Sequence, residues 1–162
     1  MDIRQEIIER RLRSYEVAAQ MNISAASFCR WLQTDLTPER RNRIRKNHSA
    51  THLLQKALQE KISSDIHQEG AYYDDELLRF DINFDSKMSE EQLNNVEKRV
   101  NEKIFESLPV KTEILSKEDA MKKNAMHLFS EKYGDKVRVV SMGDYSIEFC
   151  GGTHVDNTSE IG

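Results

Sequence analysis

The chain has 162 residues, of which 38% are apolar and 32% charged, as in a soluble cytosolic protein with one domain and a small module. No apolar run reaches about 18 residues, which excludes a membrane-spanning helix, and the N-terminus has no apolar signal core, so we expect neither export nor a membrane partner. With a formal net charge of −4 and only two cysteines, Cys29 and Cys150, metal or redox chemistry is favoured over a disulfide.

Charge is divided unevenly along the chain. Residues 1–46 carry ten Lys and Arg against six Asp and Glu, whereas the remainder carries 14 basic and 22 acidic residues. A basic N-terminal part followed by an acidic body suggests two parts, the first a candidate for contact with phosphate. A solvated, arginine-rich surface is the alternative.

Residues 1–36 are predicted to form three short helices, with Ser14 and Ser24 capping the second and third. The pattern resembles the helix-turn-helix of small DNA-binding regulators. That resemblance implies a module over residues 1–38 whose third helix enters the major groove of duplex DNA, where Arg30 would contact the nucleic acid. A helical bundle that binds nothing remains open, and Cys29 is then a small buried apolar residue of that bundle.

Residues 38–62 are predicted to form one helix, or two abutting helices. Beyond His48 one face of this helix is apolar, formed by Ala50, Leu53, Leu54, Ala57, Leu58 and Ile62. His48 and His52 are four residues apart, so both imidazoles share a face. On a helical wheel these histidines and Gln55 fall opposite the apolar face, so we expect them to point outward, toward whatever lies over the helix.

The middle of the chain is predicted to contain a loop, a strand and a long helix. Residues 65–74 are interpreted as loop and turn, and the following alternation of apolar residues predicts a strand over 77–84. Ser89 and Gln92 form a capping-box pattern that opens a helix ending before Pro109. Its inward residues are expected to be Leu93, Val96, Val100 and Ile104.

The C-terminal part is predicted to be mostly strand. Strands are expected over 110–115, 136–142 and 145–150, with a short helix capped by Ser116 and a turn at Gly143–Asp144. On the last strand one face carries Tyr145, Ile147 and Phe149, and the other carries Ser146, Glu148 and Cys150. The thiol of Cys150 is therefore expected to point away from the Ile147 face.

Cysteine and histidine recur in the motif Cys150-Gly151-Gly152-Thr153-His154. Two glycines break a helix but allow a tight turn with close backbone approach. Imidazole and thiolate are ligands of zinc, so this motif and the helical pair, that is His48, His52, Cys150 and His154, are predicted to hold a Zn²⁺ ion. A purely structural zinc site and no metal at all are the alternatives. His67 and His127 lie outside the pattern and are interpreted as surface or boundary residues.

Five segments together resemble the editing domain of alanyl-tRNA synthetase and its free-standing relatives. They are Arg40 to His52, Leu78 to Asp81, Glu131 to Val140, Cys150 to His154 and Glu160 to Gly162. The resemblance covers roughly residues 39–162, and the closing Cys-Gly-Gly-Thr-His favours the alanyl over the related threonyl type. It implies a two-layer α+β domain with helices on an antiparallel sheet, here truncated at its C-terminus.

The resemblance also implies hydrolysis of serine, or glycine, wrongly esterified to alanine tRNA in the cytoplasm. It assigns catalysis and zinc binding to His48, His52, Cys150 and His154, and it implies a zinc ion that orients the ester while water attacks the carbonyl. Substrate recognition falls to Ser49, through a hydrogen bond to the hydroxyl that alanine lacks, and to Gln68. Arg45 and Lys46 are candidates for contact with tRNA phosphate, with a solvated helix face as the alternative.

The family's aminoacylation domain has no counterpart in this sequence. Two other interpretations stay open. One is a DNA-binding regulator whose body is an inactive editing-type domain, and the other is a fragment that barely folds.

Overall fold

The computed structural model describes residues 37–126 and 135–162. Nearly all of the predicted helix-turn-helix module, with Cys29 and Arg30, lies outside these residues, and so does His127. The chain divides into two compact units, Met1–Arg40 and Arg41–Gly162. The following description concerns the second unit and the helix that leads into it.

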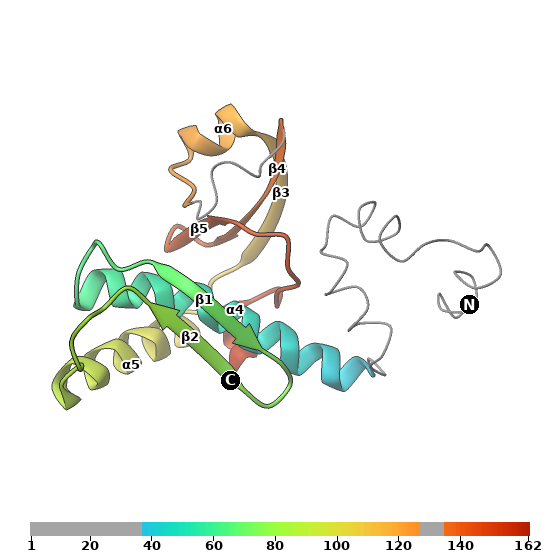
Figure 1. The fold of residues 1–162 in the computed structure, drawn as a ribbon. Helices are drawn as coiled ribbons and strands as arrows, with labels where there is room; N and C mark the ends of the chain where they lie inside the picture. The colour runs from blue at the N-terminus through green and yellow to red at the C-terminus, as the bar shows by residue number, and fades with distance from the viewer. Residues whose placement is uncertain (1–36, 127–134) are drawn as a thin grey trace, which may run out of the picture. The chain divides into compact units, whose positions relative to one another are not determined.

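The described chain is a mixture of helices and antiparallel strands (Figure 1), which confirms the predicted α+β class. One two-stranded sheet has the order β1-β2 and one three-stranded sheet has the order β3-β4-β5. None of the helices in the described ranges is long and apolar enough to cross a membrane. The elements in chain order are α4 (Pro38–Lys61), β1 (Gln68–Tyr73), β2 (Leu78–Ile82), α5 (Glu90–Phe105), β3 (Val110–Ser116), α6 (Lys117–Lys122), β4 (Lys136–Met142), β5 (Ser146–Phe149) and the 3-10 helix η2 (Thr158–Ile161).

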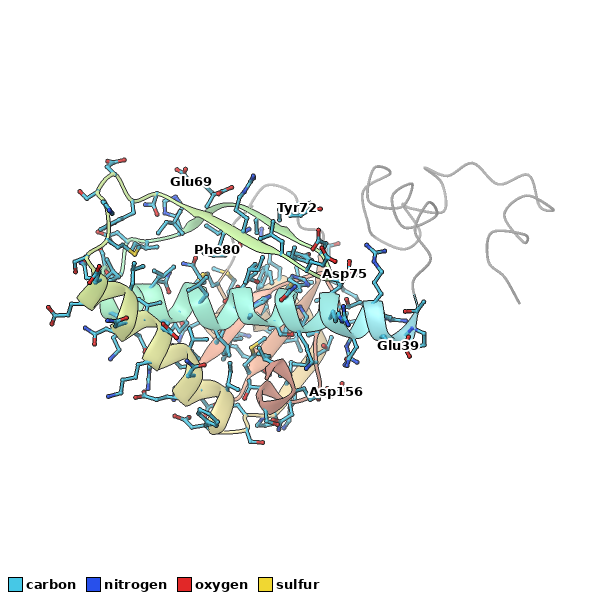
Figure 2. All side chains as sticks on the ribbon, turned by 90° about the horizontal axis from the view of Figure 1, so that it is seen from below. Glu39, Glu69, Tyr72, Asp75, Phe80 and Asp156 are labelled. Atoms are coloured by element: carbon cyan, nitrogen blue, oxygen red, sulfur yellow. The ribbon has the colours of Figure 1, made fainter. Side chains whose placement is uncertain are left out.

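Helix α4 is the element against which two apolar clusters form. It is a single helix over the range predicted for it, and Thr37 Oγ1 accepts a hydrogen bond from the Arg40 amide at its start. Its apolar residues enter two clusters. One contains Ala57, Leu58, Ile66 and Val96, and the other contains Leu53, Ile104 and Met142. Figures 1 and 2 show the β1–β2 hairpin running alongside this helix.

Strand β1 corrects the prediction of a loop over residues 65–74. Its sequence, Gln-Glu-Gly-Ala-Tyr-Tyr, lacks the apolar alternation of a half-buried strand. The segment is nevertheless extended because it pairs antiparallel with β2, from Gln68 opposite Ile82 to Tyr73 opposite Leu78, with an irregularity between Gln68 and Gly70. Cross-strand pairing, which a local pattern does not report, therefore decides this element.

Helix α5 begins at the predicted capping box. Ser89 accepts a hydrogen bond from the Gln92 amide, and the Gln92 side chain accepts one from the Ser89 amide. Val96 and Ile104 are buried as expected, but Leu93 is 51% exposed, so its inward assignment was wrong. Helical period places Leu93 on the face of Val96 and Val100, yet it is not among the apolar residues packed against the buried cluster.

The three-stranded sheet follows the sequence prediction closely. Strand β4 lies between β3 and β5, and Gly143 with φ of 54° begins the turn between β4 and β5. This left-handed conformation suits glycine. Helix α6 starts after Ser116, whose hydroxyl accepts a hydrogen bond from the Asp119 amide. Ser146 and Glu148 share one face of β5, as the alternation predicted, and both are buried there, whereas Cys150 follows the end of the strand at Phe149.

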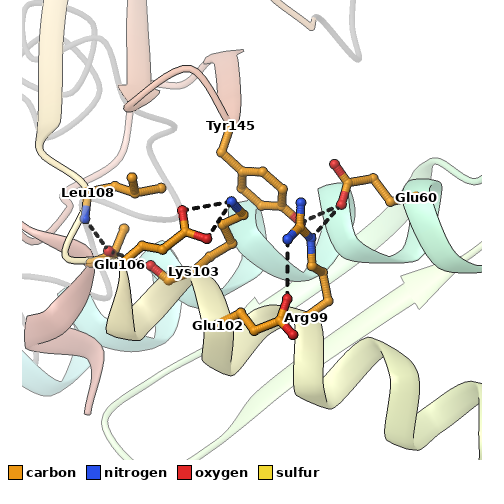
Figure 3. Close-up of polar contacts among 8 residues, drawn as sticks. Glu60, Arg99, Glu102, Lys103, Glu106, Leu108 and Tyr145 are labelled. Carbon is orange, nitrogen blue, oxygen red and sulfur yellow. Dashed lines mark hydrogen bonds and ion pairs between the residues drawn. The ribbon is translucent and has the colours of Figure 1, made fainter.

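A polar network joins α4, α5 and the β4–β5 turn (Figure 3). Arg99 on α5 donates to Glu60 on α4 over 2.7 Å, and the hydroxyl of Tyr145 lies 3.4 Å from the same carboxylate. The Tyr145 ring also lies 5.2 Å from the Arg99 guanidinium carbon and 4.8 Å from Lys103 Nζ. Such cation–π contacts hold the turn that leads into β5 against the two helices.

Removal of the α5 cap is expected to destabilise the domain. In Ser89→Ala the Gln92 amide loses its hydrogen-bond acceptor, and we expect the free energy of unfolding to fall by about 1 kcal/mol in urea denaturation. The control is Ser86→Ala, in the exposed loop before the helix. Equal effects of the two substitutions would contradict the assignment of the cap.

Candidate metal centre

Two histidines of α4 lie under the C-terminal part of the chain. His48 and His52 have ring centroids 5.6 Å apart and are only 7% and 5% exposed. They point, as predicted, toward what covers the helix, and part of that cover is Tyr73 at the end of β1, whose ring stacks on His48 at 4.2 Å. Gln55 is buried on the same helix and donates to the Ile66 carbonyl over 2.8 Å.

The other two candidate ligands lie in the turn that follows β5. The Cys150 amide donates to the Arg138 carbonyl over 3.0 Å. The Arg138 guanidinium in turn donates to the carbonyls of Cys150 and Gly152, each over 2.7 Å. Arg138 therefore holds the backbone of the turn. Sequence reasoning assigned it no role, although an arginine between valines of a strand, Val137 and Val139, was a usable signal.

The four predicted ligands come together. The thiol sulfur of Cys150 lies 3.4 Å from His48 Nε2 and 3.3 Å from His154 Nε2. One donor atom from each of the four residues, His52 included, lies within 4.8 Å of every other. Two segments about a hundred positions apart in sequence thus form one small cluster.

The donor set fits zinc. Imidazole nitrogen and thiolate sulfur are usual ligands of zinc, and four of them match its tetrahedral coordination. Tetrahedral zinc with ordinary Zn–N and Zn–S bond lengths separates nitrogen from sulfur by about 3.5 Å, close to the two sulfur–nitrogen distances at Cys150. The residues present would therefore hold such an ion without a large rearrangement.

The protonation states of Cys150 and His154 also suit metal binding. Burial raises the pKa of the Cys150 thiol, but hydrogen bonds from the three histidines outweigh this effect and lower the pKa to about 3. Burial, together with the nearby charges of His48 and His52, lowers the pKa of His154 to about 4. At neutral pH the cysteine is then a thiolate and His154 a neutral imidazole, the forms that bind metal.

His52 differs from His154 because a carboxylate faces it. Its Nδ1 lies 2.9 Å from Glu148 Oε2, an ion-pair distance, although the two groups are not aligned as a linear hydrogen bond. Burial lowers the pKa of His52, but the charge of Glu148, together with the hydrogen bond to Cys150 and its charge, outweighs this and raises the pKa to about 10. An ion bound at His52 would therefore displace a proton.

The two predicted recognition residues lie in different places. Ser49 is fully buried, and its Oγ accepts from the Val155 amide over 3.1 Å and lies 3.3 Å from His154 Nδ1. These contacts of Ser49 hold His154, one of the candidate ligands, in place. Gln68 begins β1, five residues before Tyr73, and no described contact joins its side chain to the four donors. Contact of either side chain with a substrate stays a prediction.

The two predicted phosphate-binding residues of α4 also differ. Arg45 donates to the His154 carbonyl and, over 3.0 Å, to Asp156. Its guanidinium is thus engaged by the turn that carries His154, instead of pointing free toward a partner. Lys46 is half-buried and makes no ion pair within the described part of the chain.

Comparisons with known proteins agree on one family. Residues 137–162 match the family described as the threonyl and alanyl tRNA synthetase second additional domain. The chain is 54% identical over 123 residues to alanine–tRNA ligase 1 of Lachnoclostridium phytofermentans, and also to the alanine–tRNA ligase of Thermoanaerobacter sp.. Each of these alignments covers 76% of this chain and 14% of the relative. The alanine–tRNA ligase of Sulfurovum sp. is 46% identical over 166 residues, 100% of this chain and 19% of that protein.

The chain therefore spans between 14% and 19% of the length of these relatives. The Sulfurovum match also extends through the N-terminal residues that the helix-turn-helix prediction concerned.

Glycine at position 152 is expected to be required by the site. A Cβ added there would lie 1.8 Å from His48 Cε1, whereas a Cβ at Gly151 would meet nothing within 4 Å. We expect Gly152→Ala to displace the imidazole and weaken zinc binding roughly 10- to 100-fold, the range for metal sites with disturbed supports, with Gly151→Ala as the matched control. The measurement is competition with a chromophoric chelator. Equal zinc affinity of both variants would show that the His48 ring is not held where the structure has it.

Proposed function

The chain belongs to the alanyl-tRNA synthetase editing-domain family, and from that premise we propose that it hydrolyses the ester of mischarged alanine tRNA, mainly Ser-tRNA(Ala). The observation that supports this function most is the convergence of the four donors in one cluster, in which the three histidines are buried and Cys150 is half-buried. The names of the similar proteins indicate alanine tRNA as the nucleic acid concerned.

We propose that Zn²⁺ is the resident ion and that His48, His52, Cys150 and His154 hold it. When bound, zinc would supply Lewis acidity toward the ester carbonyl, which requires a coordination position that is additional to the four ligands or exchanged with one of them. The remaining contribution of the protein is to hold its ligands: Tyr73 stacks on His48, and Arg138 fixes the turn that carries Cys150. A site of this kind is pre-organised, so less reorganisation is needed when substrate arrives.

Ser49 is the proposed recognition residue for the serine hydroxyl. If His154 binds the ion through Nε2, its Nδ1 carries a proton and donates to Ser49 Oγ. That oxygen also accepts from the Val155 amide, so both its lone pairs are used and its own proton remains available to a substrate hydroxyl. Alanine has no hydroxyl, so the correct product is not recognised in this way. The position of Gln68 gives no such support.

We propose that cations in the first half of α4 meet the tRNA backbone. Arg41 and Arg43 are exposed, and Lys46 follows one turn later. Phosphate contacts by such side chains are strongly salt-dependent. Arg45 is not included, since Asp156 and the His154 carbonyl already engage it.

The DNA-binding alternative has less support. Arg30 and the rest of its recognition helix lie outside the described residues, and similarity of the whole chain to an alanine–tRNA ligase favours a synthetase origin for that segment.

Deacylation tests the proposed function directly. Purified protein is expected to release serine from Ser-tRNA(Ala), and Cys150→Ala and His52→Ala should reduce the rate to near background because each removes a ligand. Removal of zinc by a chelator should do the same, and added zinc should restore the activity. His67→Ala, at an exposed histidine outside the cluster, serves as control. Chelator-insensitive release, or no release above background, would contradict the proposal.

The role of Ser49 can be separated from that of His154 by comparing two substrates. If the hydroxyl recognises serine, Ser49→Ala should lower kcat/KM for Ser-tRNA(Ala) by about 10-fold or more and affect Gly-tRNA(Ala) much less. Ser49→Thr, which keeps a hydroxyl, should retain the preference for serine. Equal losses on both substrates would show that Ser49 acts only by holding His154.

A further inference from the structure

A buried carboxylate stands behind one of the candidate ligands. Glu148 is 8% exposed on the inward face of β5. Burial of an ionised carboxylate is costly unless the charge is paired and hydrogen-bonded. Among residues 37–126 and 135–162, its ion-pair partner is His52, and no lysine or arginine pairs with it. Stabilisation of the fold therefore does not explain why a buried glutamate pairs with a histidine of the cluster.

Both carboxylate oxygens of Glu148 are engaged. Oε1 accepts a hydrogen bond from Ser146 Oγ over 2.7 Å, and Oε2 lies 2.9 Å from His52 Nδ1. The two oxygens have different partners, so the hydrogen bond from Ser146 holds one oxygen while the other lies beside the imidazole. Glu148 itself is not among the residues whose donor atoms converge within 4.8 Å.

The two nitrogens of an imidazole point to different sides of the ring, so an oxygen at Nδ1 leaves Nε2 for the ion. His154 shows the same arrangement, with Nδ1 3.3 Å from Ser49 Oγ and Nε2 3.3 Å from the Cys150 sulfur. Two ligands from distant segments thus have their outer nitrogen facing a buried oxygen.

Charge explains why His52 faces a carboxylate and not a second hydroxyl. A divalent cation bound by three neutral imidazoles and one thiolate leaves a net charge of +1 in a buried cluster. One further buried carboxylate brings that charge to zero. A carboxylate at Nδ1 also makes Nε2 a stronger donor to the ion.

We propose that Glu148 is a positioning residue of the metal centre, which selects the Nε2-binding tautomer of His52 and balances the charge of the ion. This inference rests on the proposed metal site. It assigns a role to a residue that lies outside the ligand set and outside any contact with substrate.

The test is metal binding by the full chain with Glu148→Gln, a substitution that keeps the shape and removes the charge. Zinc affinity, measured by chelator competition, is expected to fall 10- to 100-fold. In the Co²⁺-loaded protein the visible ligand-field bands are expected to shift, because the donor strength and orientation of His52 change. The control is Glu113→Gln on β3, whose carboxylate pairs with Lys123 at the surface, and it should leave both readouts unchanged.

Ser146→Ala is the second variant, should Glu148→Gln fail to fold. It frees one carboxylate oxygen without removing the charge, so a loss of zinc affinity smaller than that of Glu148→Gln is expected. Unchanged affinity and an unchanged Co²⁺ spectrum in a folded Glu148→Gln protein would overturn the proposal. Reduced thermal stability with unchanged affinity would also overturn it, since Glu148 would then be merely structural.

The outcomes also separate this inference from the proposed hydrolysis. A wild-type protein that binds one zinc ion but releases no serine would contradict the editing function, and the comparison with Glu148→Gln would still decide the role of Glu148. A wild-type protein that binds neither zinc nor cobalt would overturn the assignment of Glu148 together with the metal site.

Discussion

The packing of one half-buried thiolate against three buried imidazoles is the constraint on which the described domain depends. Charges taken out of water destabilise a fold by several kcal/mol each unless partners compensate for the lost hydration. Here the compensation is local: hydrogen bonds from the histidines stabilise the Cys150 thiolate, and Glu148 stabilises the positive charge of His52. The same contacts put the donors within the reach of one ion.

Two arginines hold the backbone of the C-terminal turn that carries Cys150 and His154. Arg138 holds the carbonyls of Cys150 and Gly152, and Arg45 holds the carbonyl of His154. Hydrogen bonds with a charged donor are stronger than those between neutral groups. A glycine-containing turn, which would otherwise sample many conformations, is thus fixed from β4 on one side and from α4 on the other.

The family resemblance and the geometry support each other through different residues. The match to the family covers residues 137–162, which include Cys150 and His154 but neither histidine of α4. The structure adds His48 and His52 by packing α4 beneath the C-terminal turn. A site assembled from both ends of the domain requires that the whole described fold be formed, so metal binding and folding stability are expected to be coupled.

The sequence by itself determined the features that depend on near neighbours. Histidines four apart had to share a helix face, Ser89 and Gln92 had to cap a helix, and the alternation in β5 had to put Ser146 and Glu148 on one face. The donor set, and with it the proposal of zinc as the ion, followed from residue type alone. The helix face, the helix cap and the strand alternation depend only on residues close together in the sequence.

Tertiary structure alone decided what those residues touch. Strand β1 exists because β2 pairs with it, and Leu93 is exposed because of its place along α5. The guanidinium of Arg45, expected to meet phosphate, binds the turn of His154. The positions of Arg138 and Glu148 around the cluster likewise follow from contacts between segments far apart in the chain, whose register no local pattern encodes.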